Sequence, residues 1–542
     1  MGKTIGIDLG STYSCVYYVD DDGVLKAVDS AEGQNTTPSE VYFDPDGTVL
    51  VGVEARAASA LGLERMVARV KNYMGDPNYR FSIDDQEYSP TDVSALILQK
   101  LVQDAEYALK EEIDGAVITI PAYYAGSAAY ATIQAGERVV LKNGGHLKVL
   151  RVLGEAAAAA LAYYSSLPEG TKKTVLVYDL GGGSFDCTLM NIDFTEGKKE
   201  GKIITLDGDH CLGGMDWDAA LADYVRNEFC SMTGCDPEEM MCDPACIRWF
   251  IEHSERVKKI LSQKAATKFV VNFAGFREKI ELTREIFEEV TRYLLDRTIC
   301  LVDQMLERKN MCMSQDVDEI LLVGGGSKMP QVRSRLEMEY GKPVICSAPD
   351  RLVAMGAALA ARDVAFDMVP AEPAPPRKSI EQDEGQEIMG VPMIPEEGET
   401  LMGIFARCTQ SYGLLVRRGD EEMVSNVILK DSPYPAEGTM RLVTDVPDQS
   451  TISLEVYEND SLQLEATMEE SLQVYETCTV ALTPGLPEGA PIDITLCLKL
   501  DKTLEITVLD VTNGISTVMI PAHIGGDAAD LSLEEIAGMA LE

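Results

Sequence analysis

The most constraining feature of the sequence is an aspartate–glycine turn that occurs twice. Residues 7–13 read IDLGSTY, and residues 178–186 read YDLGGGSFD. Each turn follows a short apolar run and precedes a second β-like run, so each predicts a strand, a tight glycine turn and another strand. Two such hairpins in matching contexts predict a duplicated fold that holds one nucleotide between its halves.

The chemistry of the two turns suits a polyphosphate. Glycines let backbone N–H groups approach phosphate oxygens, because no Cβ stands in the way. An aspartate at the end of a strand can hold hydrated Mg²⁺, and the neighbouring hydroxyls can donate to phosphates. A single turn would be weak evidence, since Asp-Leu-Gly is common in ordinary hairpins, but two matching turns favour a nucleotide site.

Length and charge narrow the class of protein. A chain of 542 residues is expected to form more than one domain. The formal net charge of −42 argues against a nucleic-acid partner, and we interpret it as a source of solubility. No run is long and apolar enough to span a membrane, and the chain starts on a strand-like run without a signal-peptide pattern. These features predict a cytoplasmic protein that binds neither nucleic acid nor membrane.

The cysteines are expected to be reduced thiols, because there are 13 of them at scattered spacings. Cys230, Cys235, Cys242 and Cys246 fall within one short acidic stretch. Structural zinc sites usually bring their ligands as pairs separated by two residues, and this stretch has no such pair. We therefore expect buried or incidental thiols here rather than a metal site.

The first 366 residues alternate strand-like and helix-like patterns, as α/β architecture does. The clearest predicted strands and helices lie at 116–121, 149–152, 156–164, 251–262 and 319–323. A third glycine turn at 324–327 has neither the Gly-Lys-Ser/Thr ending of a P-loop nor the spacing of a dinucleotide fingerprint.

The rest of the chain changes character. Residues 367–400 are rich in proline and acidic residues and predict an extended, solvated linker. Residues 401–520 alternate with period two, for example at 451–457, 492–500 and 504–509, and predict a small β-sandwich. Residues 521–542 form a short acidic tail, with one helical turn expected after Ser532.

Six motifs follow one another in a fixed order, at residues 6–16, 118–123, 179–186, 212–218, 323–330 and 350–358. This order resembles that of the DnaK-type molecular chaperones (heat shock protein 70 family), within the actin-like ATPase superfamily. The resemblance covers almost the whole chain and is strongest over residues 1–366. It implies a duplicated, two-lobed α/β actin-like ATPase fold followed by a small all-β sandwich.

The resemblance implies a catalytic set made of Asp8, Lys71, Glu155, Asp179 and Ser184. Asp8 and Asp179 would hold hydrated Mg²⁺ and position the attacking water, and Lys71 would neutralise charge on the transferred phosphoryl group. Glu155 would complete the shell around water and metal, and Ser184 stands where the family usually has threonine. Phosphoryl transfer needs positioning and charge stabilisation more than covalent help, so this set is sufficient in kind.

The resemblance also implies binding of ATP or ADP, with Mg²⁺ and with K⁺ as a further ion. The implied nucleotide-binding residues are Gly10, Ser11, Thr12, Tyr13, Gly181, Gly182, Gly183, Gly213, Gly214, Glu255, Lys258, Lys259, Ser262, Gly324, Gly325, Lys328 and Asp350. The four from Glu255 to Ser262 are spaced so that all can face one ligand from a single helix. Taken singly, Lys71 suits a solvated lysine and Glu255 a partner of Lys259 along the helix. Taken in order, they favour an ATP site.

The β region resembles the family's peptide-binding sandwich more weakly. The positions of the family's apolar groove are taken by Leu414, Val416, Ile452 and Leu454. These four residues would suit the core of any sandwich equally well. Arg417 and Asp445 stand where the family arches small or apolar residues over the peptide, and as an ion pair they would either close the arch or block it.

Several departures from the family bear on its mechanism. A long proline-rich linker replaces a short acidic-apolar one, and no helical lid follows the sandwich. Ala129 and Ile133 replace an expected basic pair, although Pro121 is kept. Lys328 replaces an arginine that stacks on adenine, which removes a planar partner. We therefore expect weak coupling between the nucleotide site and the sandwich.

The sequence thus predicts an ATP-binding, slowly ATP-hydrolysing, chaperone-like monomer without a lid, which binds unfolded or extended polypeptide. A J-domain co-chaperone and a nucleotide exchange factor are the further partners that the resemblance implies. One alternative is a nucleotide-dependent regulatory module for a dedicated partner. Another is a small-molecule kinase on the same fold, but the chain shows no catalytic carboxylate beside a sugar pocket, and the sandwich would be unexplained.

Overall fold

The computed structural model describes residues 2–521 apart from 60–62, 85, 125, 166, 169, 194–199, 368–402, 406–407, 409, 419–420, 431, 433–434 and 500–502. The predicted linker beyond residue 367 and the predicted helical turn after Ser532 lie outside these described residues. No helix in the described ranges combines the length and the apolar character needed to cross a membrane.

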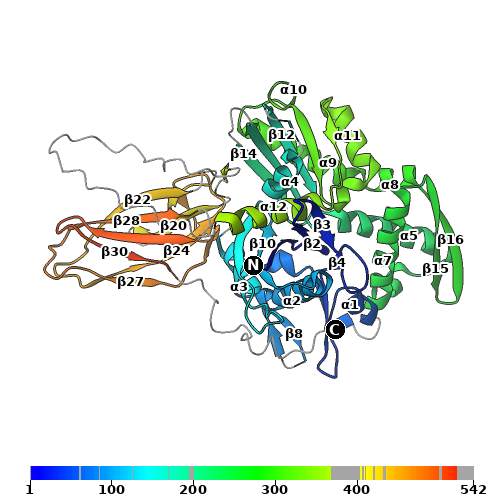
Figure 1. Ribbon diagram of the computed structural model, residues 1–542, viewed down its shortest axis with the longest axis horizontal. Helices are drawn as coiled ribbons and strands as arrows, with labels where there is room; N and C mark the ends of the chain where they lie inside the picture. The colour runs from blue at the N-terminus through cyan, green and yellow to red at the C-terminus, as the bar shows by residue number, and fades with distance from the viewer. Residues whose placement is uncertain are drawn as a thin grey trace.

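Two sheets with the same strand order build the first part of the chain (Figure 1). The first sheet runs β11 (Val149–Gly154), β10 (Ile113–Ile120), β1 (Lys3–Asp8), β2 (Tyr13–Val19) and β3 (Leu25–Val28), with β4 (Thr37–Pro38) also paired to β2. The second runs β18 (Val344–Ile345), β17 (Glu319–Val323), β12 (Lys172–Leu180), β13 (Phe185–Asp193) and β14 (Glu200–Asp209). In both sheets the hairpin is antiparallel and its first strand pairs in parallel with the next strand outward. The predicted duplication is therefore confirmed in the strand order.

The two aspartate–glycine turns occupy equivalent places in these sheets. Asp8 ends β1 and lies opposite Cys15 of β2, and Asp179 lies near the end of β12, opposite Asp186 of β13. The turns touch each other, because a Cβ built on Gly182 would lie 2.0 Å from the Thr12 hydroxyl oxygen. Only glycine fits at this point of contact.

Two alanine-rich helices, α4 (Glu155–Tyr164) and α12 (Leu352–Asp367), pack against the strands of both sheets. Their small side chains allow very close crossings. A Cβ on Gly356 would lie 1.8 Å from the carbonyl oxygen of Ala158, and a Cβ on Gly6 would lie 2.0 Å from the amide nitrogen of Ala358. This shared core joins the two halves beneath the glycine turns.

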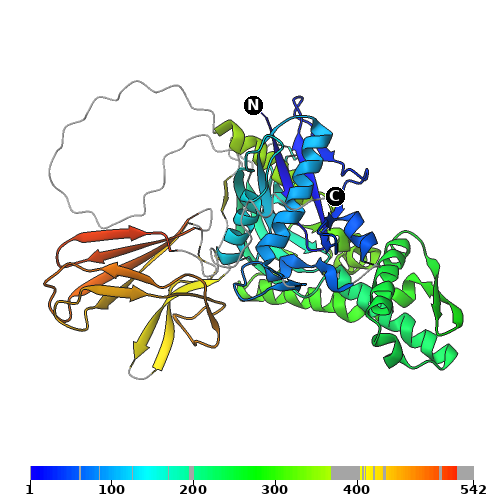
Figure 2. The same ribbon diagram turned by 90° about the horizontal axis from the view of Figure 1, so that it is seen from below.

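The outer part of the second half contains α5 (Gly214–Thr233), α7 (Pro244–Leu261) and the hairpin of β15 (Ala266–Phe273) and β16 (Phe276–Thr283) (Figure 2). Helix α7 starts where the Asp243 side chain accepts a hydrogen bond from the Ala245 amide at 2.9 Å and proline occupies the first helical position. Its apolar residues Phe250, Val257 and Leu261 belong to the core of this half. The polar stripe of the helix is thereby left to face the space between the halves.

The C-terminal part is all β, as predicted, and packs two main sheets around one core (Figures 1 and 2). The first sheet runs β25 (Glu465–Ala466), β21 (Glu421–Ile428), β20 (Ser411–Arg418), β24 (Val456–Asn459) and β26 (Ser471–Gln473). The second runs β22 (Ala436–Val443), β28 (Pro491–Leu498), β29 (Leu504–Asp510) and β30 (Ile515–Met519). Every second residue of β28 is buried, which is the pattern that predicted the strand.

The single strand predicted at 451–457 is wrong, because the structure divides it. β23 (Thr451–Leu454) pairs with β27 (Cys478–Ala481), whereas β24 pairs with β20. Glu455 lies between them and its carbonyl accepts a hydrogen bond from the Leu415 amide at 3.1 Å. The period-two pattern continues through the break, so the sequence did not show the change of partner.

The β part contacts both halves of the first part directly. Residues 403–405, expected within the sandwich, form β19 (Gly403–Phe405) and pair in parallel with β14 of the second half. On the other side, the amide of Gly126 at the start of α3 (Gly126–Glu137) donates to Tyr412 Oη at 3.0 Å and to Glu458 Oε1 at 3.2 Å. The expectation of weak coupling stays a prediction, but the parts are joined by more than the linker.

Candidate functional site

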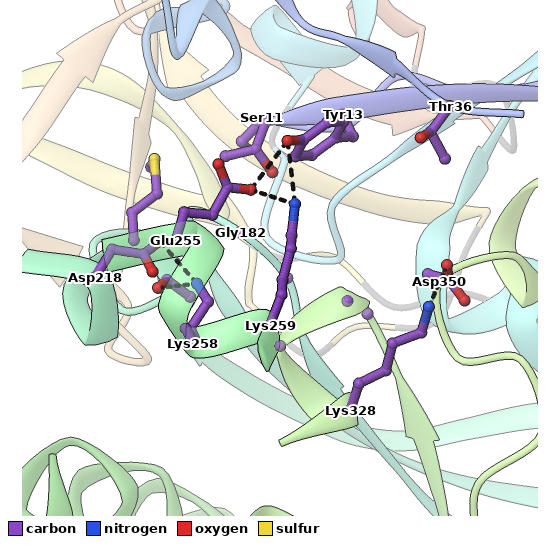
Figure 3. A pocket seen from close by; sticks show the side chains of 18 of the residues that line it. Ser11, Tyr13, Thr36, Gly182, Asp218, Glu255, Lys258, Lys259, Lys328 and Asp350 are labelled. Atoms are coloured by element: carbon purple, nitrogen blue, oxygen red, sulfur yellow. Dashed lines mark hydrogen bonds and ion pairs between the residues drawn. The ribbon is translucent and has the colours of Figure 1, made fainter. Parts of the chain in front are cut away.

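A cavity of about 1040 Å³ lies where the two glycine turns meet α7 (Figure 3). Residues from β1, β12, α5 and α7 line it, together with the third glycine turn after β17. Its size is at the upper end of the range found for small-molecule and cofactor sites. The duplicated fold therefore leaves a cavity between its halves, as the sequence predicts.

Almost all predicted catalytic and nucleotide-binding residues line this one cavity. They are Asp8, Gly10, Ser11, Thr12, Tyr13, Lys71, Glu155, Asp179, Gly181, Gly182, Ser184, Gly214, Glu255, Lys258, Lys259, Ser262, Gly324, Gly325, Lys328 and Asp350. Gly183 and Gly213 are the two that do not line it. A Cβ on Gly213 would lie 2.6 Å from the backbone of Gly182, so Gly213 supports the second turn from behind.

Lys71 is held inside the protein rather than on its surface. It lies in the short 3₁₀ helix η2 (Val70–Tyr73), only 5% of the residue is exposed, and its ammonium group forms an ion pair with Glu155. The Tyr124 hydroxyl donates to the Lys71 carbonyl at 2.6 Å and fixes the backbone. The interpretation of Lys71 as a solvated lysine is therefore wrong.

An excess of carboxylates surrounds this lysine. Burial, reinforced by the charge of Glu155, raises the pKa of Asp8 to about 7 and that of Asp179 well above its ordinary value. The same two causes raise the pKa of Asp186. Burial acts to lower the pKa of Lys71, but Glu155, Asp8 and Asp179 outweigh it and raise that pKa. One ammonium group thus faces several carboxylates that repel one another.

This excess of negative charge fits a hydrated divalent cation. Mg²⁺ is commonly held by one or two carboxylates, with waters and substrate phosphates completing its shell. The described side chains do not group three or more potential ligands around one point, so the protein would supply only part of such a shell. Asp8 and Asp179, at the ends of the two hairpins, are the residues that would hold it.

The polar stripe of α7 borders the cavity, as predicted (Figure 3). Glu255 Oε1 lies 2.6 Å from Lys259 Nζ, so the helical pairing expected from spacing is also present. Lys258 turns away from this pair, since its Nζ donates to the Gly214 carbonyl at 2.6 Å and to Asp218 Oδ2 at 2.7 Å. The stripe therefore both faces the cavity and is tied to α5.

Tyr13 links the two halves across the cavity (Figure 3). Its hydroxyl donates to Glu255 Oε1 at 2.9 Å and accepts from Arg56 at 2.6 Å and from Lys259 at 3.2 Å. The Lys259 ammonium also lies 4.7 Å from the centre of the Tyr13 ring. The cavity is thus spanned by contacts that do not involve a ligand.

Sequence reasoning missed several residues of this link. Arg56 donates through Nε to Glu40 Oε1 at 3.1 Å, and Arg248 of α7 reaches Glu40 Oε2 at 3.2 Å. Asp218, which pairs with Lys258 of α7, ends the motif at residues 212–218, but the sequence assigned it no role of its own. No local pattern marks these charges, because each acts on a partner from a different element.

Lys328 and Asp350 lie on the side of the cavity formed by the third glycine turn (Figure 3). Lys328 ends the 3₁₀ helix η3 (Gly325–Lys328), and its Nζ lies 2.5 Å from Asp350 Oδ2. An ammonium group offers a point charge and no plane, so this side of the cavity lacks a stacking surface at Lys328.

The four clustered cysteines differ in their surroundings. Cys230 is buried, Cys242 is exposed, and Cys235 and Cys246 pack partly against the core of the second half. The Cys230 sulfur lies 3.6 Å from that of Met240. Within the described ranges, these side chains do not form a group of three that could hold a metal ion.

The predicted peptide-groove residues divide between core and partial exposure. Leu414 and Leu454 are 1% and 3% exposed and belong to the sandwich core, so they offer almost no surface to a ligand. Ile452 packs partly against the same core, and Val416 is half-buried. The side chain of Arg417 lies outside the described part, so its pairing with Asp445 is untested.

Comparisons with known proteins agree with this geometry. A family model described as "Hsp70 protein" matches residues 4–81 and 76–365. The chain is 32% identical over 525 residues to the chaperone protein DnaK of Thermotoga petrophila and to that of Thermotoga maritima, which covers 95% of this chain and 80% of each relative. It is 30% identical over 524 residues to the chaperone protein DnaK of Thermosipho melanesiensis, with 95% and 79% covered.

Proposed function

The chain belongs to the Hsp70 family, and from this premise we propose that it binds Mg²⁺–ATP in the cavity and slowly hydrolyses it to ADP and phosphate. The observation that carries the proposal is the position of Lys71. This buried lysine is enclosed by carboxylates beside the two glycine turns, where the phosphates of a nucleotide would lie.

The residues of the cavity supply what phosphoryl transfer requires. Backbone amides of the two turns would bind phosphate oxygens, and Ser184 would add a hydroxyl donor. Lys71 would stabilise the charge that develops on the transferred group, and Glu155 holds its ammonium in place. A bound Mg²⁺, held by Asp8 and Asp179, would neutralise phosphate charge. The α7 stripe and Asp350 would enclose the adenosine.

For the β part, the proposal is a sandwich that binds extended polypeptide. The DnaK relatives are named as chaperones, and the match to them covers 95% of this chain, so it includes most of the sandwich. A J-domain co-chaperone and a nucleotide exchange factor are the partners that fit this assignment. The strand β19 and the Gly126 contacts tie the sandwich to the two halves that would enclose the nucleotide.

A second candidate is a nucleotide-dependent module whose β part contacts one dedicated partner. The burial of Leu414 and Leu454 favours it, because a general apolar groove would need those side chains at its surface. The two candidates share the nucleotide site and differ only in what the β part binds.

Nucleotide binding is tested by thermal melting of the full chain with Mg²⁺ and millimolar ATP or ADP. Ligand that binds only the folded state at 100 times its Kd stabilises by about 2.7 kcal/mol. We expect a clear rise in the melting temperature, and a smaller rise when Mg²⁺ is replaced by EDTA. An unchanged melting curve at millimolar Mg²⁺–ATP contradicts the proposal.

Steady-state ATP turnover with and without a reduced, unfolded polypeptide separates the two candidates. Direct binding of a fluorescent extended peptide is measured in parallel by anisotropy. Saturable binding of several unrelated peptides supports the chaperone assignment. Absence of binding to all of them, in a protein that binds nucleotide, favours the dedicated-partner module.

A further inference from the structure

Asp218, in the second turn of α5, is a buried carboxylate beside the nucleotide cavity. The residue is 2% exposed and borders the cavity (Figure 3). Its Oδ2 accepts from Lys258 Nζ at 2.7 Å, while its Oδ1 has no hydrogen-bond partner among the described residues. A charge kept inside a protein with one oxygen unpartnered is costly, so its position needs a reason.

The partner of Asp218 belongs to a chain of contacts that ends on the second glycine turn. Lys258 Nζ also donates to the Gly214 carbonyl at 2.6 Å. The Gly214 amide donates to the Gly181 carbonyl at 3.0 Å, and the Met215 amide donates to the Gly182 carbonyl at 2.9 Å. The first turn of α5 thus lies between α7 and the second glycine turn and is hydrogen-bonded to both.

We propose that Asp218 is a positioning residue for nucleotide binding, which holds Lys258 so that α7 and the second glycine turn keep the spacing that one nucleotide requires. The inference rests on the proposed nucleotide site. Asp218 acts through Lys258 rather than through the reacting atoms, so its loss weakens affinity more than it slows the turnover of bound ATP. A bound nucleotide that contacts both α7 and the glycine turn depends on their separation, and a small misplacement is costly.

Titration of Asp218 distinguishes this role from simple structural support. Burial raises the pKa of Asp218 from 3.8 to about 6, with Lys258 opposing the rise, Glu255 adding to it and Lys259 opposing it, all three on α7. Below about pH 6 the carboxyl takes up a proton and Lys258 loses its counter-ion, so nucleotide affinity falls. Because the folded-state pKa lies above the ordinary value, the carboxyl's contribution to folding stability grows as the pH falls from about 6 to about 4. Binding and stability therefore move in opposite directions.

The test compares the full-length protein with Asp218→Asn. Titration calorimetry gives the Kd for Mg²⁺–ADP at pH 7.5, 6.5 and 5.5, and melting temperatures are measured at the same values. We expect Asp218→Asn to bind about tenfold more weakly at pH 7.5, with turnover of bound ATP within about threefold of wild type. The ratio of the two Kd values should fall towards one at pH 5.5. The ADP phosphate titrates in the same pH range, but it affects both Kd values alike and therefore cancels in their ratio.

Asp104→Asn is the matched control. Asp104 lies in the first half, 8% of its side chain is exposed, and it pairs with Lys100 at 2.8 Å, so the same atoms change in a similar setting away from the cavity. This variant should change the melting temperature and leave the Kd for Mg²⁺–ADP as in wild type. Equal loss of affinity in both variants would show that the effect is general destabilisation and overturn the inference.

Other outcomes also decide the question. A Kd ratio that is one at pH 7.5, or that stays constant between pH 7.5 and 5.5, overturns the positioning role. If Asp218→Asn does not fold, Asp218→Ser removes the charge with a smaller side chain and leaves Lys258 in place. That variant should bind about tenfold more weakly without the pH-dependent loss, and wild-type affinity in it overturns the inference. Absence of Mg²⁺–ADP binding in wild type would instead contradict the proposed function.

Discussion

The two halves of the nucleotide-binding part share one strand order but contribute different kinds of groups to the site. Both place an aspartate at or next to the end of a strand, at Asp8 and at Asp179, and follow it with a glycine turn. The first half adds the buried charge of Lys71 and its half-buried partner Glu155. The second half adds backbone groups from the glycine turns at 181–183, 213–214 and 324–326. It also adds the polar side chains along α7.

The difference shows what duplication must keep. Backbone N–H groups bind phosphate only if the turn geometry is retained, so glycine turns persist in both halves. A single buried ammonium group is sufficient for one transferred phosphoryl group, and a second would add desolvation without a partner. We therefore expect changes to shared features to affect metal binding, and changes to unshared features to separate catalysis from affinity.

Removing Lys71 should have the largest effect on ATP turnover, because this buried ammonium group comes from the first half and has no counterpart in the second. Lys71→Ala is expected to lower the turnover of bound ATP by about 100-fold or more, while the Kd for Mg²⁺–ADP changes only a few-fold. Single-turnover hydrolysis of ATP measures the first quantity and titration calorimetry the second. Lys100→Ala, a buried lysine outside the cavity, should affect stability and leave turnover of the folded protein unchanged. Wild-type turnover no faster than that of Lys71→Ala would show a binder rather than an ATPase.

Asp8 and Asp179 are the shared feature, so Asp8→Asn and Asp179→Asn should resemble each other. In wild type, Mg²⁺ should increase the affinity for ADP, and each variant is expected to reduce this gain in affinity about tenfold. Without nucleotide the effect on stability has the opposite sign. Because burial raises the pKa of Asp8 to about 7, the ionised carboxylate destabilises the folded state at pH 8. Asp8→Asn should then melt a few degrees higher at pH 8, and the difference should close as the pH falls towards 4.

A lower melting temperature for Asp8→Asn at pH 8, without ligand or Mg²⁺, would show that the carboxylate stabilises the empty site. In that case the repulsion among the carboxylates around Lys71 does not govern this region, and the case for a cation based on excess charge fails.

Much of the fold followed from local pattern. The strand predicted at 319–323 is β17 with the same bounds, since a buried apolar run between polar and glycine residues leaves little choice. The break at Glu455 and the pairing of β19 with β14 could not be predicted in this way. Both depend on which strand lies alongside, and the alternation of side chains carries no information about the partner.

The same distinction between local pattern and pairing partner applies to the residues of the site. Lys71, Asp179 and the α7 stripe were found because their motifs are local and ordered. Arg56 and Asp218 were missed because each is defined by a partner on another element, Glu40 and Lys258 respectively. Sequence spacing predicts which residues share a helix face, but not which of them pair with a neighbouring helix, as Lys258 does with Asp218 of α5.

A variant at Lys328 tests whether charge or stacking on the base contributes more to nucleotide affinity in the second half. Lys328→Arg restores a planar guanidinium that can stack on a purine and still pair with Asp350, whose Oδ2 lies 2.5 Å from the present ammonium. We expect about threefold tighter binding of Mg²⁺–ADP, which corresponds to about 0.7 kcal/mol. Lys342→Arg, on the surface of the same half, should have no effect. Weaker binding in Lys328→Arg would show that the space beside the base is already filled.

The smallest effect is expected where the halves meet the β part, and Gly126→Ala tests it. A Cβ here would lie 3.1 Å from Tyr412 Oη, 3.2 Å from Tyr475 Oη and 3.3 Å from Glu458 Oε1, which is tighter than ordinary contact. Alanine suits a helix better than glycine, so α3 itself should not be destabilised. We expect faster amide exchange at the start of β20, because the first half loosens its hold while β19 still joins the sandwich to the second half. ATP turnover should change less than threefold. A tenfold change, about 1.4 kcal/mol, would show that contact with the first half controls the site and that the expectation of weak coupling is wrong.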